Sequence, residues 1–338
     1  MLLLLSTNAY SADPGWLACR NEPSERQLAC YQQATDQYLT DNRPMEKKAE
    51  AAAEVSTPNY DWKTDRLWPL PQEMPDTRRL ANTFLQYKQN YLLADLMRNP
   101  NETPNSPNPL NNVLTPSPAK GEELKFQISL KGQLPLSWPW GDTLWFTYTQ
   151  QSHWQAFNGN NSRPFRETNY MPELIFLSHR FDDRVPTLGA LTPRLLNLSY
   201  IHQSNGETLP ESRSWNRLTA QIGSEYRFKD SELGAQEKKL TVTIRPWWRI
   251  PEDGKDDDNP DITKYMGHGD LEIGYWHGRQ FMTAVLRSRA VQLDWSYPLS
   301  AELNALNFHL QYFNGYGESL IDYNHKLHSF GIGFSLPY

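Results

Sequence analysis

The sequence predicts an all-β fold: an antiparallel transmembrane β-barrel of about twelve strands with a short N-terminal periplasmic extension. Aromatic residues make up 12% of a chain whose mean hydropathy is −0.72, which is typical of an apolar outer band that alternates with a polar interior. No apolar run approaches the roughly 18 residues of a membrane-spanning helix. Segments of about ten residues instead recur between clusters of Gly, Pro, Asn and Asp.

The N-terminal part differs in composition from the rest of the chain. Residues 1–11 form an apolar run that ends in small residues, which predicts the end of a secretory signal cleaved after Ser11. Residues 12–75 predict a partly disordered periplasmic extension with one short helix over 25–39. The barrel that carries the candidate site is expected over 76–338.

Cys19 and Cys30 are the only two cysteines. In an oxidising periplasm, a disulfide between them would close a short loop and contribute about 3 kcal/mol. The alternative is a pair of unrelated free thiols. A metal site is not expected, because two cysteines without a nearby histidine supply too few ligands.

Twelve segments predict the strands of the barrel. They cover residues 84–93, 123–132, 142–151, 171–180, 194–203, 214–223, 239–248, 270–278, 280–288, 290–299, 306–315 and 330–338. If both termini are periplasmic, the longer loops should follow odd-numbered strands. Polar loops follow the third, fifth, seventh and eleventh segments, as this topology requires.

The last segment has the pattern of a closing barrel strand. Phe330, Ile332, Phe334 and Leu336 alternate with smaller or polar residues, and the segment ends on Tyr338. The net charge of −6 does not indicate binding to nucleic acid, so nucleic-acid partners are not expected.

A polar group stands at the rim of two neighbouring predicted strands. Residues two apart on a strand share a face, so His202 and Ser204 lie on the same face as Leu196, Leu198 and Tyr200. Asn216 shares its face with the apolar residues of 214–223. Because the more apolar face of each strand contacts lipid, all three polar residues are expected on the outer wall of the barrel.

The loop between these strands sets their register. A hairpin centred on Leu209 places Ser204 opposite Ser214 and His202 opposite Asn216. A hydroxyl, an imidazole and an amide within hydrogen-bond reach form a base-activated nucleophile with an orienting third group. An amide suits this position, because an ionised carboxylate near acyl chains would carry a desolvation cost.

Two other interpretations of this group stay open. An H-x-S pair alone is also typical of a polar barrel rim, and the G-x-S-x-G motif of soluble hydrolases is absent. A passive porin or adhesin barrel would explain the alternation equally well. A channel would nevertheless place its polar residues in the lumen rather than on the outer wall.

Five stretches together resemble the outer-membrane phospholipase A family of Gram-negative bacteria. They are HQSNG and SRSWNR within 202–217, YTQQSHWQ (148–155), PFRETNY (164–170), DDNPDITKYMG (257–267) and GYGESLIDYN (315–324). The similarity runs in order from about residue 84 to the C-terminus. It implies a calcium-dependent, homodimeric serine hydrolase of the outer membrane that cleaves phospholipid acyl esters in the outer leaflet, with phospholipase A1, A2 and lysophospholipase activity. Another lipid hydrolase, acting on lipid A, would need a different set of loops.

The resemblance also implies roles for the residues of the rim. Ser204 would be the nucleophile, His202 the general base, Asn216 the orienting residue and Gly206 a backbone donor to the oxyanion. Ser204, His202 and Asn216 are the same three residues that strand parity brings together.

The resemblance further implies a Ca²⁺ site and a dimer contact. Main-chain carbonyls of Glu207 and Ser212, together with Ser162 of a second copy, would hold the ion. Asp258 matches an acidic position associated with calcium, and its alternative role is solvation of the loop. Gln150 would form a hydrogen bond across the dimer, and otherwise it is a rim residue. Leu209 stands where some members carry an Asp of an additional calcium site, so that site is not expected.

Overall fold

The computed structural model describes residues 19–41, 84–116, 118–139, 142–181, 185–228, 238–300 and 306–337. The chain divides into two units, Met1–Asp65 and Arg66–Tyr338. The predicted signal and most of the predicted extension lie outside the described residues, as does Tyr338.

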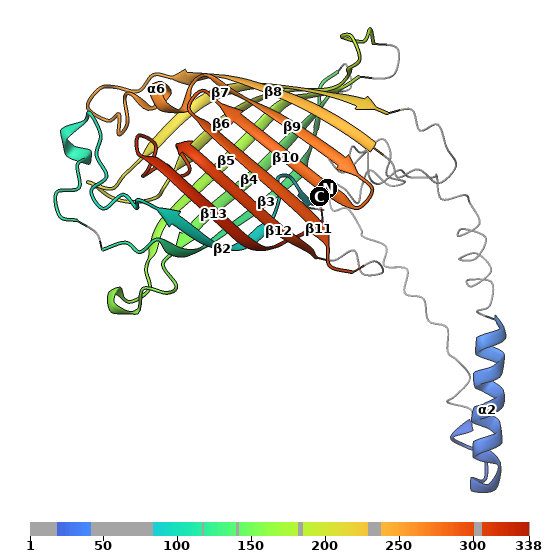
Figure 1. The fold of residues 1–338 in the computed structure, drawn as a ribbon. Coiled ribbons are helices and arrows are strands. Elements are labelled where there is room, and N and C mark those ends of the chain that lie inside the picture. Colours follow the sequence, from blue (N-terminus) through green and yellow to red (C-terminus); the bar gives the residue numbers. More distant parts are fainter. Residues whose placement is uncertain are drawn as a thin grey trace, which may run out of the picture. The chain divides into compact units, whose positions relative to one another are not determined.

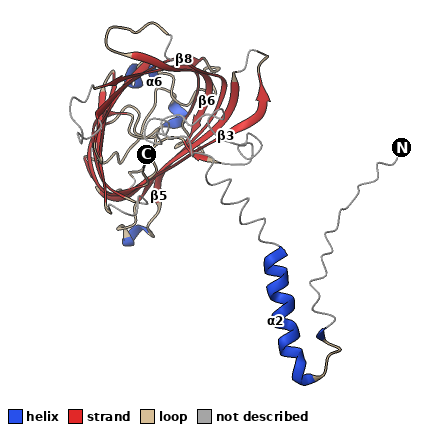
Figure 2. Ribbon diagram, turned by 90° about the vertical axis from the view of Figure 1, so that its right-hand side faces the viewer, coloured by secondary structure: helices blue, strands red, loops and turns tan. Residues whose placement is uncertain are grey.

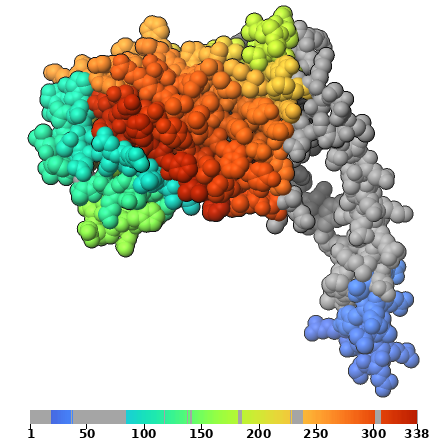
Figure 3. Space-filling model, in the orientation of Figure 1, coloured from blue at the N-terminus to red at the C-terminus, as the bar shows by residue number. Residues whose placement is uncertain are grey.

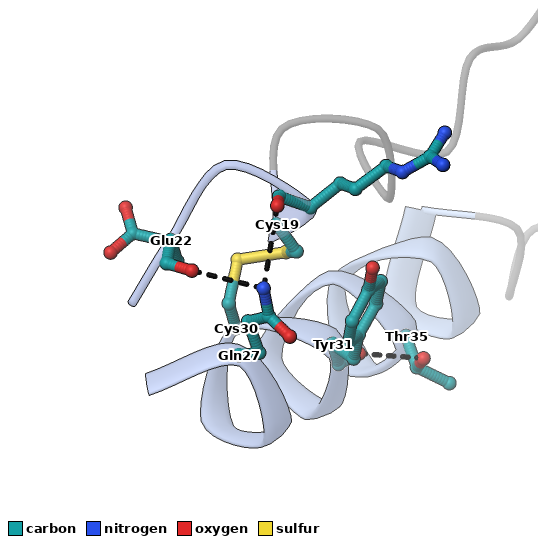
Figure 4. The surroundings of a disulfide bond; sticks show 7 residues. Cys19, Glu22, Gln27, Cys30, Tyr31 and Thr35 are labelled. Carbon is teal, nitrogen blue, oxygen red and sulfur yellow. Dashed lines mark hydrogen bonds between the residues drawn. A yellow bond between two sulfur atoms is a disulfide. The ribbon is translucent and has the colours of Figure 1, made fainter. Parts of the chain in front are cut away.

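The first unit contains one helix, α2 (Ser24–Asp41), within its described part. Cys19 and Cys30 form a disulfide that ties the segment before the helix to its second turn (Figure 4). The side-chain amide of Gln27 donates to the carbonyls of Arg20 and Glu22, at 3.3 and 3.0 Å. The disulfide interpretation of the two cysteines is therefore confirmed. No helix among the described residues is both long and apolar enough to span a membrane.

The second unit is a closed antiparallel barrel of twelve strands with one additional short strand, which confirms the predicted fold class (Figures 1 and 2). The strands are β1 (Leu85–Gln86), β2 (Tyr91–Arg98), β3 (Glu122–Ser137), β4 (Thr143–Trp154), β5 (Phe165–Arg180), β6 (Thr192–Ser204), β7 (Ser214–Arg227), β8 (Lys238–Ile250), β9 (Gly269–His277), β10 (Gln280–Arg287), β11 (Ala290–Pro298), β12 (Asn307–Tyr316) and β13 (Lys326–Ser335). Each strand from β2 to β13 pairs with the next, and β13 pairs with β2 to close the ring.

The first predicted strand differs from the structure in its bounds. The predicted segment 84–93 is interrupted, with β1 and the start of β2 both pairing with β3. At the interruption, the side-chain oxygen of Asn90 accepts from the Ser129 N–H in place of a backbone carbonyl. The barrel strand then continues to Arg98, five residues beyond the predicted end.

The outer wall is apolar, as contact with lipid requires. Along β13, Phe330, Ile332 and Phe334 are 46 to 48% exposed and alternate with Ser329, Gly331 and other inward residues, as predicted. Large exposed apolar side chains of other strands extend this surface; they include Leu92, Leu96, Ile128, Phe146, Leu174, Leu218, Ile244 and Leu293. Figure 3 shows the wall over β9 to β13 as a continuous surface.

The lumen is filled by charged and polar side chains rather than by a single apolar core. Lys125 Nζ lies 2.7 Å from Glu318, and Arg166 lies 2.6 Å from Asp322, with these side chains almost fully buried. One apolar cluster lies at the end of the barrel that carries the candidate site. It packs Trp215 against α6 (Ile262–Met266) and the loop after β12. This cluster anchors the start of β7 from the inside.

Candidate functional site

The predicted hairpin register between β6 and β7 is confirmed. His202 pairs with Asn216, and Ser204 pairs with Ser214. The intervening residues Gln203 and Trp215 are buried inside the barrel, at 8 and 1% exposure. His202, Ser204 and Asn216 therefore share the outward face, as parity predicts.

His202 and Asn216 form a hydrogen bond on this face. The ring Nδ1 of His202 lies 2.9 Å from the amide Oδ1 of Asn216. Because an amide oxygen can only accept, Nδ1 carries the proton and Nε2 keeps its lone pair. The ring is thus in the form that can take a proton from a neighbouring hydroxyl.

Ser204 lies two residues from His202 on the same side of β6. The described residues include no hydrogen bond between its hydroxyl and the imidazole, so this contact stays a prediction. Two residues along a strand are about 6.6 Å apart, so the contact requires the imidazole of His202 to turn along the strand towards Ser204. Catalytic contacts of this kind also commonly tighten only when substrate binds.

Two further side chains hold Asn216, and sequence reasoning missed both. The Tyr200 hydroxyl donates to Asn216 Oδ1 at 2.7 Å, and Asn216 Nδ2 donates to Glu252 Oε1 at 3.0 Å. Tyr200 has the same parity as His202 and could have been included from the pattern. Glu252 comes from the loop after β8, and burial raises the pKa of its carboxyl.

Gly206 follows the nucleophile candidate in a conformation that favours glycine. Its φ is +71°, and a Cβ at this position would lie 2.9 Å from the ring of Tyr170. Within the described part of the chain, the Gly206 N–H donates no hydrogen bond. A free backbone donor beside the nucleophile candidate is what an oxyanion site requires.

Asn205 organises the loop, and it was also missed by sequence reasoning. Its Oδ1 accepts from the N–H groups of Glu207 and Arg213, at 3.3 and 2.9 Å, and its Nδ2 donates to the Glu211 carbonyl at 2.8 Å. An Asn-Gly pair after a strand is a turn signal that could have indicated this role.

The structure brings Ser212 and Asp258 together, two of the four residues expected at calcium. The hydroxyl of Ser212 donates to Asp258 Oδ2 at 2.8 Å. Asn111, which sequence reasoning missed, donates to Asp258 Oδ1 at 3.1 Å and to the Ser212 carbonyl at 2.8 Å. Arg213 donates to the same carbonyl at 2.7 Å, and burial lowers the pKa of its guanidinium. Carbonyl, hydroxyl and carboxylate oxygens are the donors that a hard cation prefers.

Glu207 and Ser162 are exposed, and neither forms a hydrogen bond with Ser212 or Asp258 among the described residues. Glu207 is on the same loop as Ser212, whereas Ser162 follows η3 (Gly159–Asn161) in the loop between β4 and β5. Ser162 has a left-handed φ of 56°. No contact between Ser162 and Asp258 is found among the described residues.

Gln150 lies on the outer wall, as parity predicts, and its amide is hydrogen-bonded within the chain. Tyr148 donates to Gln150 Oε1 at 3.0 Å, and Gln150 Nε2 donates to Ser152 Oγ at 3.2 Å. Leu209, at the tip of the hairpin, is 54% exposed.

Comparison with known proteins identifies relatives of the whole barrel. A family model described as Phospholipase A1 matches residues 70–336. A putative phospholipase A1 of Neisseria meningitidis is 41% identical over 224 residues, which is 63% of this chain and 54% of the relative. The chain thus spans about half the length of that relative. Phospholipase A1 of Escherichia coli K12 is 38% identical over 226 residues, or 64% of this chain and 71% of the relative.

Solved structures agree with the sequence comparison. The outer membrane phospholipase dimer of Salmonella typhi with bound calcium gives a TM-score of 0.61 at 33% identity, covering 75% of this chain and 92% of that one. The outer membrane phospholipase A of Escherichia coli gives a TM-score of 0.61 at 32% identity, covering 77% and 96%.

Proposed function

This chain belongs to the phospholipase A1 family and forms an outer-membrane β-barrel, and from that premise we propose that it hydrolyses acyl esters of phospholipids in the outer leaflet. The proposal covers phospholipase A1, A2 and lysophospholipase activity. The observation that carries it is the His202–Asn216 hydrogen bond on the outward face, beside Ser204.

The reaction we propose is acyl transfer to water. His202 Nε2 takes the proton of Ser204 as Oγ attacks the ester carbonyl, and the Gly206 N–H donates to the developing oxyanion. The protonated imidazole then gives its proton to the departing lysophospholipid oxygen, leaving an acyl ester on Ser204. Water, deprotonated by His202, releases the fatty acid and restores the serine. Asn216 holds the imidazole in one tautomer throughout.

Calcium fits the oxygen donors beside this site. The carbonyls of Glu207 and Ser212, the carboxylate of Asp258 and the hydroxyl of Ser162 from a second copy would hold it. The Ser212 carbonyl already accepts from Asn111 and Arg213, so one of these donors must turn away for that oxygen to coordinate an ion. When bound, the cation would supply positive charge that polarises the ester carbonyl.

A homodimer is part of the same proposal. A site completed by Ser162 of another copy is incomplete in a monomer, so association would switch activity on. We assign Gln150 to the contact between copies, where its amide would exchange an internal bond for one across the interface. The relative from Salmonella typhi was solved as a dimer.

A passive porin or adhesin is the alternative that the experiment must exclude. Buried ion pairs such as Lys125–Glu318 fill part of the lumen that a porin would leave open. The test measures fatty-acid release from phospholipid micelles with calcium and with chelator. We expect calcium-dependent release that falls by at least about 10³-fold in Ser204→Ala. Ser224→Ala, an outward serine at the other end of β7, serves as the control and should behave as the parent. Equal release by parent and Ser204→Ala would refute the proposal.

A further inference from the structure

The orientation of the Asn216 amide determines which form of His202 the site contains. Oxygen and nitrogen of an amide are distinguished by their hydrogen-bond partners. Asn216 Oδ1 faces two donors, the hydroxyl of Tyr200 at 2.7 Å and the ring Nδ1 of His202 at 2.9 Å. Its Nδ2 faces the carboxylate of Glu252 at 3.0 Å.

Neither Tyr200 nor His202 by itself fixes this orientation. A tyrosine hydroxyl accepts as readily as it donates, and neutral imidazole can do either at Nδ1. If the amide turned over, its NH₂ would donate to Nδ1 and the ring proton would move to Nε2. An Nε2 that carries the proton cannot accept one from Ser204.

The Glu252 carboxylate removes this ambiguity. An ionised carboxylate only accepts, so a reversed amide would set its oxygen against another acceptor. A hydrogen bond to a charged group is stronger than one between neutral groups, and the reversed arrangement would lose it. This difference is enough to keep the amide in one orientation.

The fold places Glu252 beside Asn216. Asn216 pairs with Ile250, the last residue of β8, and Glu252 follows after one proline. Glu252 is half-buried, and Asn216 is its only hydrogen-bond partner in the described residues. The neighbouring Arg249 pairs instead with Asp257, at 2.6 Å. The carboxylate is therefore directed to the amide rather than to an ion pair.

We propose that Glu252 is a positioning residue that fixes the Asn216 amide and, through it, the His202 tautomer. This inference rests on the proposed function. It adds a carboxylate, Glu252, behind the Ser204, His202 and Asn216 side chains. The group that touches the imidazole is neutral, as its position near acyl chains favours. The negative charge lies one step further out, in the loop after β8, where water can solvate it.

The test compares kcat and KM of the parent, Glu252→Gln and Glu252→Ala on phospholipid micelles at saturating calcium. Glutamine can present its oxygen to Nδ2 but also its NH₂, so we expect a small loss in kcat of about 2-fold, and about 5-fold for alanine, with KM little changed. Asp253→Asn removes a neighbouring charge on the same loop and should leave both constants unchanged. Circular dichroism and elution volume confirm that each variant is folded.

A double variant separates positioning from a purely structural role. In Asn216→Asp, two carboxylates face each other, so we expect a loss in kcat of at least about 30-fold. Adding Glu252→Gln replaces that repulsion with an amide donor, and we expect at least about 10-fold of kcat to return. A structural role for Glu252 would instead make the double variant worse.

The outcomes distinguish the inference from the function on which it rests. A parent protein without calcium-dependent hydrolysis overturns the proposed function and this inference with it. An active parent whose kcat is unchanged in Glu252→Ala overturns only the role of Glu252. The same holds if the double variant is no more active than Asn216→Asp.

Discussion

His202 on β6 lies directly opposite Asn216 on β7, with the ring Nδ1 2.9 Å from the amide oxygen. This contact joins two neighbouring strands on the face of the barrel that meets lipid. It sets the proton of the imidazole on Nδ1 and leaves Nε2 to act as a base.

His202 and Asn216 should differ in the size of their contributions. Removal of a general base costs about 10²–10⁴-fold, so His202→Ala should lose most of the activity. Asn216→Ala removes a neutral hydrogen bond and should cost about 10-fold in kcat. Initial rates of fatty-acid release measure both. A larger loss for Asn216→Ala than for His202→Ala would contradict the assigned roles.

Tyr200 should contribute less than either residue. Its hydroxyl donates to Asn216 Oδ1, so Tyr200→Phe loses one hydrogen bond and should lower kcat by about 5-fold. Tyr312 also faces outward, and Tyr200 and Tyr312 are each 38% exposed. Tyr312 has no contact with the site among the described residues. Tyr312→Phe should keep the parental rate, and equal losses in the two variants would mean that the hydroxyl of Tyr200 has no specific role.

Gly206→Ala should reduce activity through a steric effect. The new Cβ would lie 2.9 Å from the Tyr170 ring, so the loop must move and the Gly206 N–H with it. Loss of one oxyanion donor costs about 10²–10³-fold in kcat. Gly189 has a similar φ of +63° with no atom within 4 Å of an added Cβ, and it lies in the turn at the other end of β6. Gly189→Ala should lower stability by about 1 kcal/mol without changing kcat.

Asp258→Asn should weaken the response to calcium. Because Asp258 would bind the cation, loss of its charge should raise the half-saturating calcium concentration by about 10-fold or more. The rate of hydrolysis at saturating calcium should change little. Asp256→Asn, on the same loop and exposed, is the matched control. An identical calcium dependence in both variants would leave Asp258 the role of supporting the loop through Ser212, Ser214 and Asn111.

The stability of the barrel should fall in acid through Glu318. Burial opposes ionisation of this carboxyl, but the charge of Lys125 outweighs it and holds the pKa of Glu318 below its ordinary value of 4.5. A group with a lowered folded pKa contributes stability above its unfolded pKa and loses it as the pH falls through the folded value. Urea unfolding in micelles should therefore show a decreasing free energy of unfolding below about pH 4.5.

Glu318→Gln provides the control for this pH dependence. The variant should be less stable at neutral pH by about 3–5 kcal/mol, because Lys125 is left buried without its partner. It should also show a shallower decline in acid. Parallel curves for parent and variant would assign the acid sensitivity to other carboxyls.

The barrel and its outward residues could be predicted because both depend on a period of two. Alternation alone identifies the lipid face of β6 and β7, and the length of the loop then fixes the register of His202 against Asn216. The bounds of the first strand could not be predicted from the alternation alone. They depend on the side chain of Asn90, which replaces a backbone carbonyl opposite Ser129.

The surroundings of the site could not be predicted from local pattern. Glu252 is 36 residues from Asn216 in sequence, and Asn111 is 101 residues from Ser212. Glu252 lies in the loop after β8, and Asn111 lies in the short 3-10 helix η2 (Pro109–Asn111) between β2 and β3. The course of such connections follows no period and depends on packing against other connections. Strand parity therefore gives the three facing side chains, whereas the groups that orient them require the folded structure.

The central claim is that Ser204 is the nucleophile on the outer wall, and the most direct measurement identifies the residue that reacts covalently with an electrophilic substrate analogue. The intact protein would be treated with a long-chain sulfonyl fluoride in calcium-containing micelles, digested and mapped by mass spectrometry. We predict one adduct, on Ser204, which is lost in His202→Ala because the hydroxyl then has no base. An adduct on a different serine, or equal labelling of the parent and His202→Ala, would contradict the account.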